Sequence, residues 1–491
     1  MASEGIVASR GNGAGQGAQR EAADGGDVAF LLTVHPAALP AMRRLAALYE
    51  RLLARLRRHR HTAWLAREHF IFFALASVVL PLLMPRTLAL MTYALERFVL
   101  GHAVARPALE GWPAMPSLVL PAVAASLLAF FLPRPARLVA LLGFSVVSGW
   151  FFGYLDALSV GLFGLFVLAA FGVIRLPVSR AVALALLCIL ALVLLLASVH
   201  WFDDRAIAAI GTFQVTLLPM LWYSAYEHRA PRRPLALRRF ASYLYLRFFG
   251  GPVVTYTDVF SAADGQRLSQ VRFAGMKALY IAALASLATA GAHSIWRAMP
   301  VNEQTGLSLL AVSYVGYVGE NCQLVLAFNV VIGVLRLFGV PLRDNFNYWL
   351  LARTPNEHWQ RWNLLFREWV VTFVFFPIMK SRRWLFAAVM SSLLVSGFLH
   401  IFAAAIAGTT GVFASVLYML YWTVNGLAIY AVIKVPQRFP RLVSALGMRS
   451  SLAWSVFGIV ATSSFYAVLH GVRSSCRDWS EVAGFFARLL H

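Results

Sequence analysis

The chain has 491 residues, of which 60% are hydrophobic and only 13% are charged, and its formal net charge is +22 at pH 7. A soluble protein carries about 25% charged residues, so this composition excludes a soluble globule, a disordered chain and a disulfide-rich scaffold. It predicts an all-α polytopic integral membrane protein, because the strands of a transmembrane β-barrel alternate polar and apolar residues. The excess of cations fits the positive cytoplasmic loops of membrane proteins, so we expect no nucleic-acid partner.

The first residues differ in composition from the rest. Residues 1–27 are rich in Gly and Ala and show no periodicity, which predicts a disordered N-terminal tail without the apolar core of a signal peptide. Residues 28–69 contain leucines at helical spacing, such as Leu48, Leu52 and Leu56, among many arginines. This pattern predicts a basic amphipathic helix lying on the cytoplasmic leaflet, ahead of a multi-span domain over 70–491.

Apolar segments of near the ~20 residues that cross a bilayer as helix follow along the chain. We expect 308–338 to be bent or split because it is long, and 368–380 to be too short for a full crossing. The alternation of Lys/Arg-rich and Lys/Arg-poor loops places the N-terminus in the cytoplasm. The expected spans are 70–94, 117–133, 137–155, 157–174, 181–200, 207–226, 276–296, 308–338, 368–380, 384–405, 412–434 and 452–470.

Two stretches interrupt the apolar pattern. In the first, Gly250-Gly251-Pro252 lies within a hydrophobic segment and ends any helix there. Irregular backbone at membrane depth is buried in protein or lines a cavity. We therefore expect a re-entrant or bent segment, with an ordinary interfacial loop as the alternative.

The second stretch, 344–363, holds many hydrogen-bonding side chains and three tryptophans. Thr354 followed by Pro355 and Glu357 is typical of a helix start, with Thr354 as the N-cap and Glu357 reaching back. In that helix Trp359, Trp362 and Asn363 would share a face, and Arg361 would project elsewhere to pair with Glu357. An interfacial helix with a tryptophan belt is the alternative interpretation.

One histidine, His400, lies inside the expected span 384–405. An ionisable side chain within a membrane helix is costly and indicates a functional site. Burial disfavours the imidazolium, so His400 is expected to be neutral and able to accept a proton. The alternative is a core histidine bonded to a backbone carbonyl. His200 and His470 lie near span ends and are interpreted as interfacial. The three cysteines are far apart and predict neither a disulfide framework nor a metal site.

The region 245–400 resembles the membrane-bound O-acyltransferases, particularly the bacterial branch of alginate O-acetylation and teichoic-acid D-alanylation proteins. The branch carries Asn-Phe-Asn-Tyr, Thr-x-x-Glu-Phe-Trp-x-Arg-Trp-His, a following Trp and Pro, and an earlier Gly-Pro-Ile-Val-x-Tyr. The matching residues here are Gly251, Pro252, Tyr256, Asn345, Phe346, Asn347, Tyr348, Ala352, Thr354, Glu357, Trp359, Arg361, Trp362, Trp369 and Pro377.

Several positions depart from that branch. Asn363 stands where the branch has His, as it does in animal members that acylate proteins and peptides. Glu320-Asn321-Cys322-Gln323 stands where the family has Asp-Phe-Ser-Gly, and the Trp and trailing Gly that usually flank the second His are absent around His400. These departures indicate a divergent member with a different acceptor, and an inactive relative stays open as an alternative.

The resemblance implies a bundle of about 11–13 helices, including re-entrant segments, around a central funnel or tunnel in the bacterial inner membrane. It implies transfer of an acyl group, with acetyl expected, from a cytoplasmic thioester (acetyl-CoA or acyl carrier protein) to a hydroxyl. The hydroxyl would belong to an envelope polysaccharide, a lipid or another secreted acceptor. No permanently bound cofactor and no metal are expected; the expected partners are membrane lipids, the donor, the acceptor and other envelope-biosynthesis proteins.

In this scheme His400 is the expected general base, and Asn363 donates a hydrogen bond to the oxyanion. The donor tunnel is expected to be lined by Trp359, Arg361, Trp362, Gly251, Pro252, Tyr256, Asn347 and Tyr348. Two other classes stay open: a polysaccharide or lipid transporter, and a catalytically silent scaffold of a polymer-synthesis complex.

Overall fold

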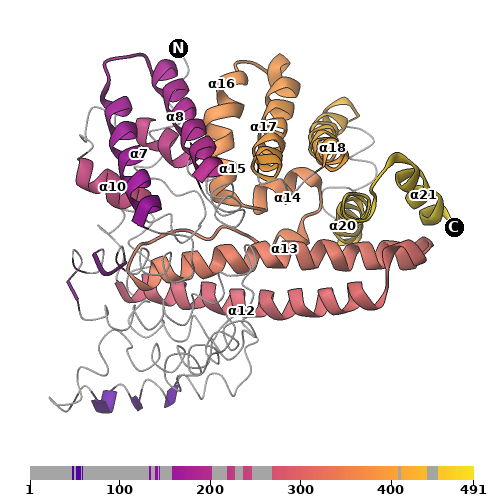
Figure 1. Cartoon of the computed structure of the whole chain (residues 1–491). Coiled ribbons are helices and arrows are strands. Elements are labelled where there is room, and N and C mark those ends of the chain that lie inside the picture. Colours follow the sequence, from indigo (N-terminus) through magenta and orange to yellow (C-terminus); the bar gives the residue numbers. More distant parts are fainter. Residues whose placement is uncertain are drawn as a thin grey trace.

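The computed structural model describes residues 157–201, 218–226, 236–245, 268–406, 411–439 and 452–491, together with isolated positions between 47 and 143. Every regular element in these described ranges is a helix, which confirms the all-α class (Figure 1). The helices are α7 (Ala157–Arg175), α8 (Arg180–Trp201), α10 (Leu237–Tyr245), α12 (Leu268–Ala298), η7 (Val301–Glu303), α13 (Gly306–Leu337), η8 (Trp349–Leu351), α14 (Pro355–Arg361), α15 (Leu364–Val370), η9 (Val371–Phe375), α16 (Phe376–Ile378), η10 (Arg382–Trp384), α17 (Leu385–Ile406), α18 (Val412–Arg438), α20 (Leu452–Ser475) and α21 (Trp479–Leu490).

Within the described ranges, four helices are long and apolar enough to cross a membrane: α12, α13, α18 and α20. Together with the shorter apolar helices α7, α8 and α17 they coincide with the spans expected from the sequence, which confirms a polytopic membrane protein. The expected span 308–338 is not split, because α13 is one continuous helix. The short segment 368–380 is divided among α15, the π-helical turn η9 and α16.

Several expectations lie outside the described residues. They are the tail 1–27, the span 70–94, all but isolated positions of the spans 117–133 and 137–155, residues 207–217 of the span 207–226, the side chain of His200, and the Gly251-Pro252 break together with Tyr256. Of the segment 28–69 only isolated positions are described, and these are helical, with both Leu48 and Leu52 exposed.

The hairpin of α12 and α13 is the long pair of antiparallel helices at the base of the bundle in Figure 1. Small residues let the two backbones approach: a Cβ built on Gly333 would lie 2.7 Å from Leu279 Cγ, and one on Gly319 would lie 2.7 Å from Ala292 Cβ. Such close approach is how membrane helices gain dispersion contacts when burial from lipid gives little driving force. Among the four described spans, α13 is the most enclosed: 67% of its most apolar part is buried, against 44%, 28% and 17% for α12, α18 and α20.

Arg336, at the end of α13, holds the turn that leads into the polar stretch 344–363. Arg336 is 4% exposed, and its Nη1 lies 2.8 Å from Asp344 Oδ1. Its Nε donates to the Leu342 carbonyl at 2.8 Å, so the guanidinium holds the turn that follows the helix. A buried arginine with a carboxylate and carbonyl partners is compensated for its lost hydration. The chain therefore enters the 344–363 stretch from an anchored point.

Candidate functional site

The helix start expected at Thr354 is confirmed. The Thr354 hydroxyl accepts from the Glu357 backbone N–H at 3.1 Å, and Pro355 occupies the first turn of α14. Glu357 reaches back to the Arg353 N–H at 2.8 Å and pairs with Arg361, as expected. Partial burial opposes ionisation of this carboxyl, but the hydrogen bonds from Arg353 and the charge of Arg361 outweigh it and lower the pKa of Glu357. Glu357 is therefore a structural acid of the helix cap.

The expectation that Trp359, Trp362 and Asn363 share a helix face was wrong. Helix α14 ends at Arg361, Trp362 is extended, and Asn363 adopts a left-handed conformation with φ 44°. The break turns Trp362 into the core, where it is 7% exposed, and Trp349 is 6% exposed. Tryptophans of a membrane-interface belt face the headgroups, so the belt interpretation of this stretch was also wrong.

The backbone amide of Leu365 and the side-chain amide of Asn345 set the orientation of the Asn363 side chain. The backbone N–H of Leu365 can only donate, and it contacts Asn345 Oδ1 at 3.0 Å. Asn345 must then turn its Nδ2 toward Asn363, whose Oδ1 accepts at 3.1 Å. Asn345 is fully buried, which holds this pair in place. The carbonyl oxygen of the Asn363 amide is thereby occupied, and its Nδ2 is left as a donor.

The position of His400 fixes its tautomer. Its Nδ1 lies 2.6 Å from the Ser396 carbonyl oxygen one turn earlier on α17. A carbonyl only accepts, so Nδ1 carries the proton and Nε2 presents a lone pair. The carbonyl bond foreseen by the core-histidine interpretation is present, and it is also the bond that makes Nε2 a proton acceptor.

Among the described elements, three helices meet around His400. The rings of Phe366 on α15 and of Trp422 and Tyr418 on α18 lie at centroid distances of 6.0, 5.4 and 6.3 Å from the imidazole. Asn363 caps α15 one turn before Phe366, so the structure brings the cap of α15 and His400 to the same part of the bundle. The Trp359 ring packs on the Trp422 ring of the same helix α18, at a centroid distance of 5.0 Å.

Gly397 makes room for this arrangement. A Cβ at this position would lie 2.7 Å from Trp422 Cδ1, so Gly397→Ala should displace the indole that packs on His400. We expect a loss of about 1–3 kcal/mol of stability from overpacking, measured as a lower melting temperature in detergent. Gly161→Ala is the matched control, because nothing lies within 4 Å of the Cβ built there. Equal melting temperatures for the two variants would contradict the role of Gly397.

Other expected tunnel residues lie elsewhere. Tyr348 is 72% exposed and left-handed with φ 47°, and Asn347 is also exposed. The backbone of Asn347 is held by its N–H, which donates to the Arg361 carbonyl at 2.9 Å. These two side chains lie on the surface of the loop, and the structure does not bring them to His400.

Sequence reasoning missed His358, which is 4% exposed in the middle of an aromatic cluster. Its ring lies 4.2 Å from that of Tyr466 and stacks on Trp362 at 5.9 Å. Burial lowers the pKa of His358 from 6.5 to about 3, and a hydrogen bond with the Trp349 backbone opposes this only in part. No pattern in the sequence separates this histidine from its less buried neighbours in α14.

Because the folded protein binds this proton more weakly than the unfolded chain, His358 should make stability pH-dependent. The contribution is complete above pH 6.5 and is lost as the pH falls from 6.5 toward 3, with a slope of at most about 1.4 kcal/mol per pH unit. We expect His358→Phe to flatten the fall of the melting temperature in this range. His293→Phe, at an exposed histidine, should leave it unchanged. A wild-type slope in His358→Phe would contradict this assignment.

The sequence interpretation of His470 as interfacial was wrong, because this side chain is 7% exposed and packs inside the bundle. Its Nδ1 lies 2.8 Å from Glu320 Oε2, and Arg473 pairs with the same carboxylate oxygen. The Arg473 guanidinium also lies 5.4 Å above the Tyr418 ring, next to His400. The rule that singled out His400, an ionisable group inside an apolar span, would also have found Glu320.

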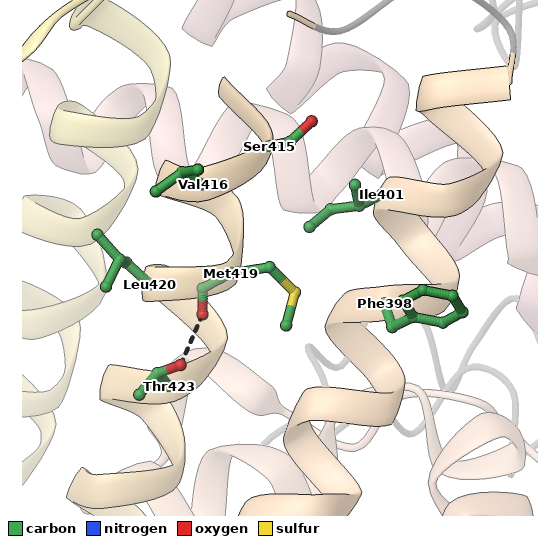
Figure 2. Close-up of a pocket in the computed structure, with 7 residues that line it drawn as sticks. All are labelled: Phe398, Ile401, Ser415, Val416, Met419, Leu420 and Thr423. Carbon is green, nitrogen blue, oxygen red and sulfur yellow. Dashed lines mark hydrogen bonds between the residues drawn. The ribbon is translucent and has the colours of Figure 1, made fainter. Parts of the chain in front are cut away.

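An open groove of about 350 Å³ lies between α17 and α18 (Figure 2). On α17 the lining residues Phe398 and Ile401 point at least 100° around the helix from His400, at 3.6 residues per turn. The groove is almost wholly apolar, and it lies on the outer side of the two helices. Its lining residues are Phe398, Ile401, Ser415, Val416, Met419, Leu420 and Thr423.

No protein-family model matches this chain. A stretch of 64 residues is 36% identical to diacylglycerol O-acyltransferase 1-1 of Oryza sativa subsp. japonica, an enzyme of the membrane-bound O-acyltransferase family. The stretch covers 13% of this chain and 12% of the rice protein, so the similarity is confined to one region of each. It supports a relationship between this membrane protein and the membrane-bound O-acyltransferases.

Proposed function

We propose that the chain is a membrane O-acyltransferase that moves an acyl group from a thioester donor to a hydroxyl acceptor. The observation that carries the proposal is the fixed tautomer of His400, whose Nε2 lone pair is free to take a proton within the bundle. The local similarity to an acyltransferase supports the same chemistry.

In the proposed reaction, His400 Nε2 removes the proton of the acceptor hydroxyl as its oxygen attacks the thioester carbonyl. The carbonyl oxygen becomes an oxyanion, and the Asn363 Nδ2–H donates a hydrogen bond to it. When the tetrahedral intermediate collapses, the C–S bond breaks and the thiolate takes the proton from His400. The products are an ester and a free thiol, so the step needs no other reactant.

We also propose an acyl group, an acceptor class and an orientation in the membrane. The acyl group is acetyl, and the acceptor is an envelope polysaccharide, lipid or other secreted hydroxyl compound. The donor approaches from the cytoplasmic side of a bacterial inner membrane, with the N-terminus of the chain on that side. The Lys/Arg distribution among the loops supports this orientation.

Mass spectrometry of base-labile esters tests the proposal. Cells expressing the full chain are compared with cells carrying an empty vector, and polymers, lipids and secreted compounds are analysed separately. We expect an ester that is present only with the chain, which identifies the acyl group and acceptor together. Identical ester profiles, with a polymer or lipid redistributed across the membrane, would instead favour a transporter.

A further inference from the structure

The cluster of Glu320, His470 and Arg473 lies on the far side of His400 from α14. Three residues along α18 show this order. Asn425 Oδ1 accepts from the Trp359 indole N–H of α14 at 3.3 Å, and Trp422, nearer the start of α18, packs on His400. Tyr418, one turn nearer still, lies beneath Arg473. Tyr418 and Asn425 are seven residues apart, which is about 10 Å along a helix. The base therefore lies between the α14 loop and the charged cluster.

The cluster is nearer to the end of the bundle where α13 and α18 begin. Phe413, in the first turn of α18, packs on Trp479 at 5.3 Å, and a Cβ on Gly306 at the start of α13 would lie 3.4 Å from His491. This end is distinct from the one that carries Asn345 and Asn363. If the donor approaches from the α14–α15 side, the opposite side is left for the acceptor.

Glu320 is accessible despite its place in the middle of the most enclosed helix. Its side chain is 41% exposed, whereas His470 is 9% exposed and Arg473 is 23% exposed. A carboxylate in a membrane helix faces the bundle interior or a water-filled space, because hydrocarbon would not solvate it. The exposed part of Glu320 is therefore expected to face water or a polar ligand.

We propose that Glu320 and Arg473 bind the hydroxyl groups of the acceptor, and that this acceptor is polyhydroxylated, like a sugar or a polyol. The inference rests on the proposed acyl transfer. Both basic partners contact the same oxygen, Oε2, so Oε1 can accept from a hydroxyl. Arg473 can donate to a neighbouring hydroxyl. The ring of Tyr418, beside both Arg473 and His400, supplies an apolar face for the C–H side of such a molecule.

An apolar acceptor fits these residues poorly. It would leave the carboxylate and the guanidinium without new partners while removing water from them, which is unfavourable. The apolar groove of α17 and α18 lies on the other side of both helices and offers no such polar groups. Recognition by Glu320 thus selects against acceptors with a single hydroxyl on a hydrocarbon chain.

Kinetics with two acceptor probes test this inference. The purified full chain is given acetyl-CoA with either methyl α-glucoside or 1-octanol. We expect wild type to acetylate the glucoside, and Glu320→Gln to raise the KM for the glucoside about ten-fold or more, as for a lost charged hydrogen bond. The KM for acetyl-CoA should not change. Glu303→Gln, at an exposed carboxylate near the start of α13, is the matched control and should behave as wild type.

The other outcomes are distinct. Acetylation of octanol but not of the glucoside would overturn the inference and leave the proposed function intact, as would an equal effect of Glu320→Gln on both acceptors. A wild-type chain that releases no CoA with either acceptor would overturn the proposed function and this inference with it.

A second measurement covers the case in which Glu320→Gln does not fold. Tyr418→Cys, in a chain whose three cysteines are replaced by serine, is treated with a water-soluble cationic thiosulfonate. We expect the reagent to modify the introduced thiol, and we expect methyl α-glucoside, but not octanol, to lower the rate of this modification. A thiol that remains unmodified, or that the glucoside does not protect, would contradict the assignment.

Discussion

His400→Ala should abolish acyl transfer while leaving the protein folded in the membrane. The variant removes the proton acceptor that the structure places at the meeting point of α15, α17 and α18, which is Nε2 of the imidazole. Loss of a positioned general base lowers kcat by about 10²–10⁴-fold. Transfer is measured as CoA released per enzyme at saturating donor, at matched membrane levels.

His293→Ala is the control for this change. His293 is an exposed histidine of α12, so the same substitution there removes an imidazole without touching the site. We expect wild-type activity from it. Full activity from His400→Ala, with an unchanged melting temperature, would return His400 to a structural histidine bonded to Ser396.

Asn363→Asp should lower kcat by about 10²–10³-fold, the usual effect of removing one oxyanion donor. Aspartate keeps the shape of the side chain and tolerates the left-handed conformation at φ 44°. It also keeps an oxygen that accepts from Asn345. What it loses is the Nδ2 donor, so the expected signature is a fall in kcat with little change in melting temperature. Asn363→Ala would add backbone strain and is a less direct test.

Asn347→Asp is the matched control, because this amide is exposed and lies two residues after Asn345, the partner of Asn363. If both variants lose activity equally, the effect comes from added negative charge near the loop, and the role of Asn363 as a donor is wrong. If neither loses activity, the oxyanion is stabilised by other groups.

The helices of this protein could be read from its sequence. An apolar run long enough to cross a bilayer has few other structures available, because backbone groups in lipid must bond within the helix. The run 452–470 accordingly lies within α20, and 412–434 within α18. His400 could be singled out for a related reason, since an imidazole in such a run is energetically costly.

The parts that failed depend on single residues with unusual conformations or distant partners. Nothing in the Trp362-Asn363 sequence reveals that Asn363 takes a left-handed conformation, which keeps it from sharing a helix face with Trp359. The amide pair of Asn345 and Asn363 joins residues on either side of a helix. The pairing of Glu320 with Arg473 joins helices more than a hundred residues apart, and no helical periodicity encodes it.

The α12–α13 hairpin also ties this protein to the thickness of its bilayer. The two helices have 31 and 32 residues, roughly 45–50 Å of helix where the hydrocarbon layer measures about 30 Å. Such a hairpin tilts or projects into the headgroups, and the tilt or the projection changes when the lipid chains are lengthened or shortened. Glu320 lies near the midpoint of α13, where a change of tilt moves a residue least, so the ends of the hairpin shift while Glu320 keeps its depth. A change in bilayer thickness is therefore expected to alter the surroundings of the hairpin ends more than those of Glu320.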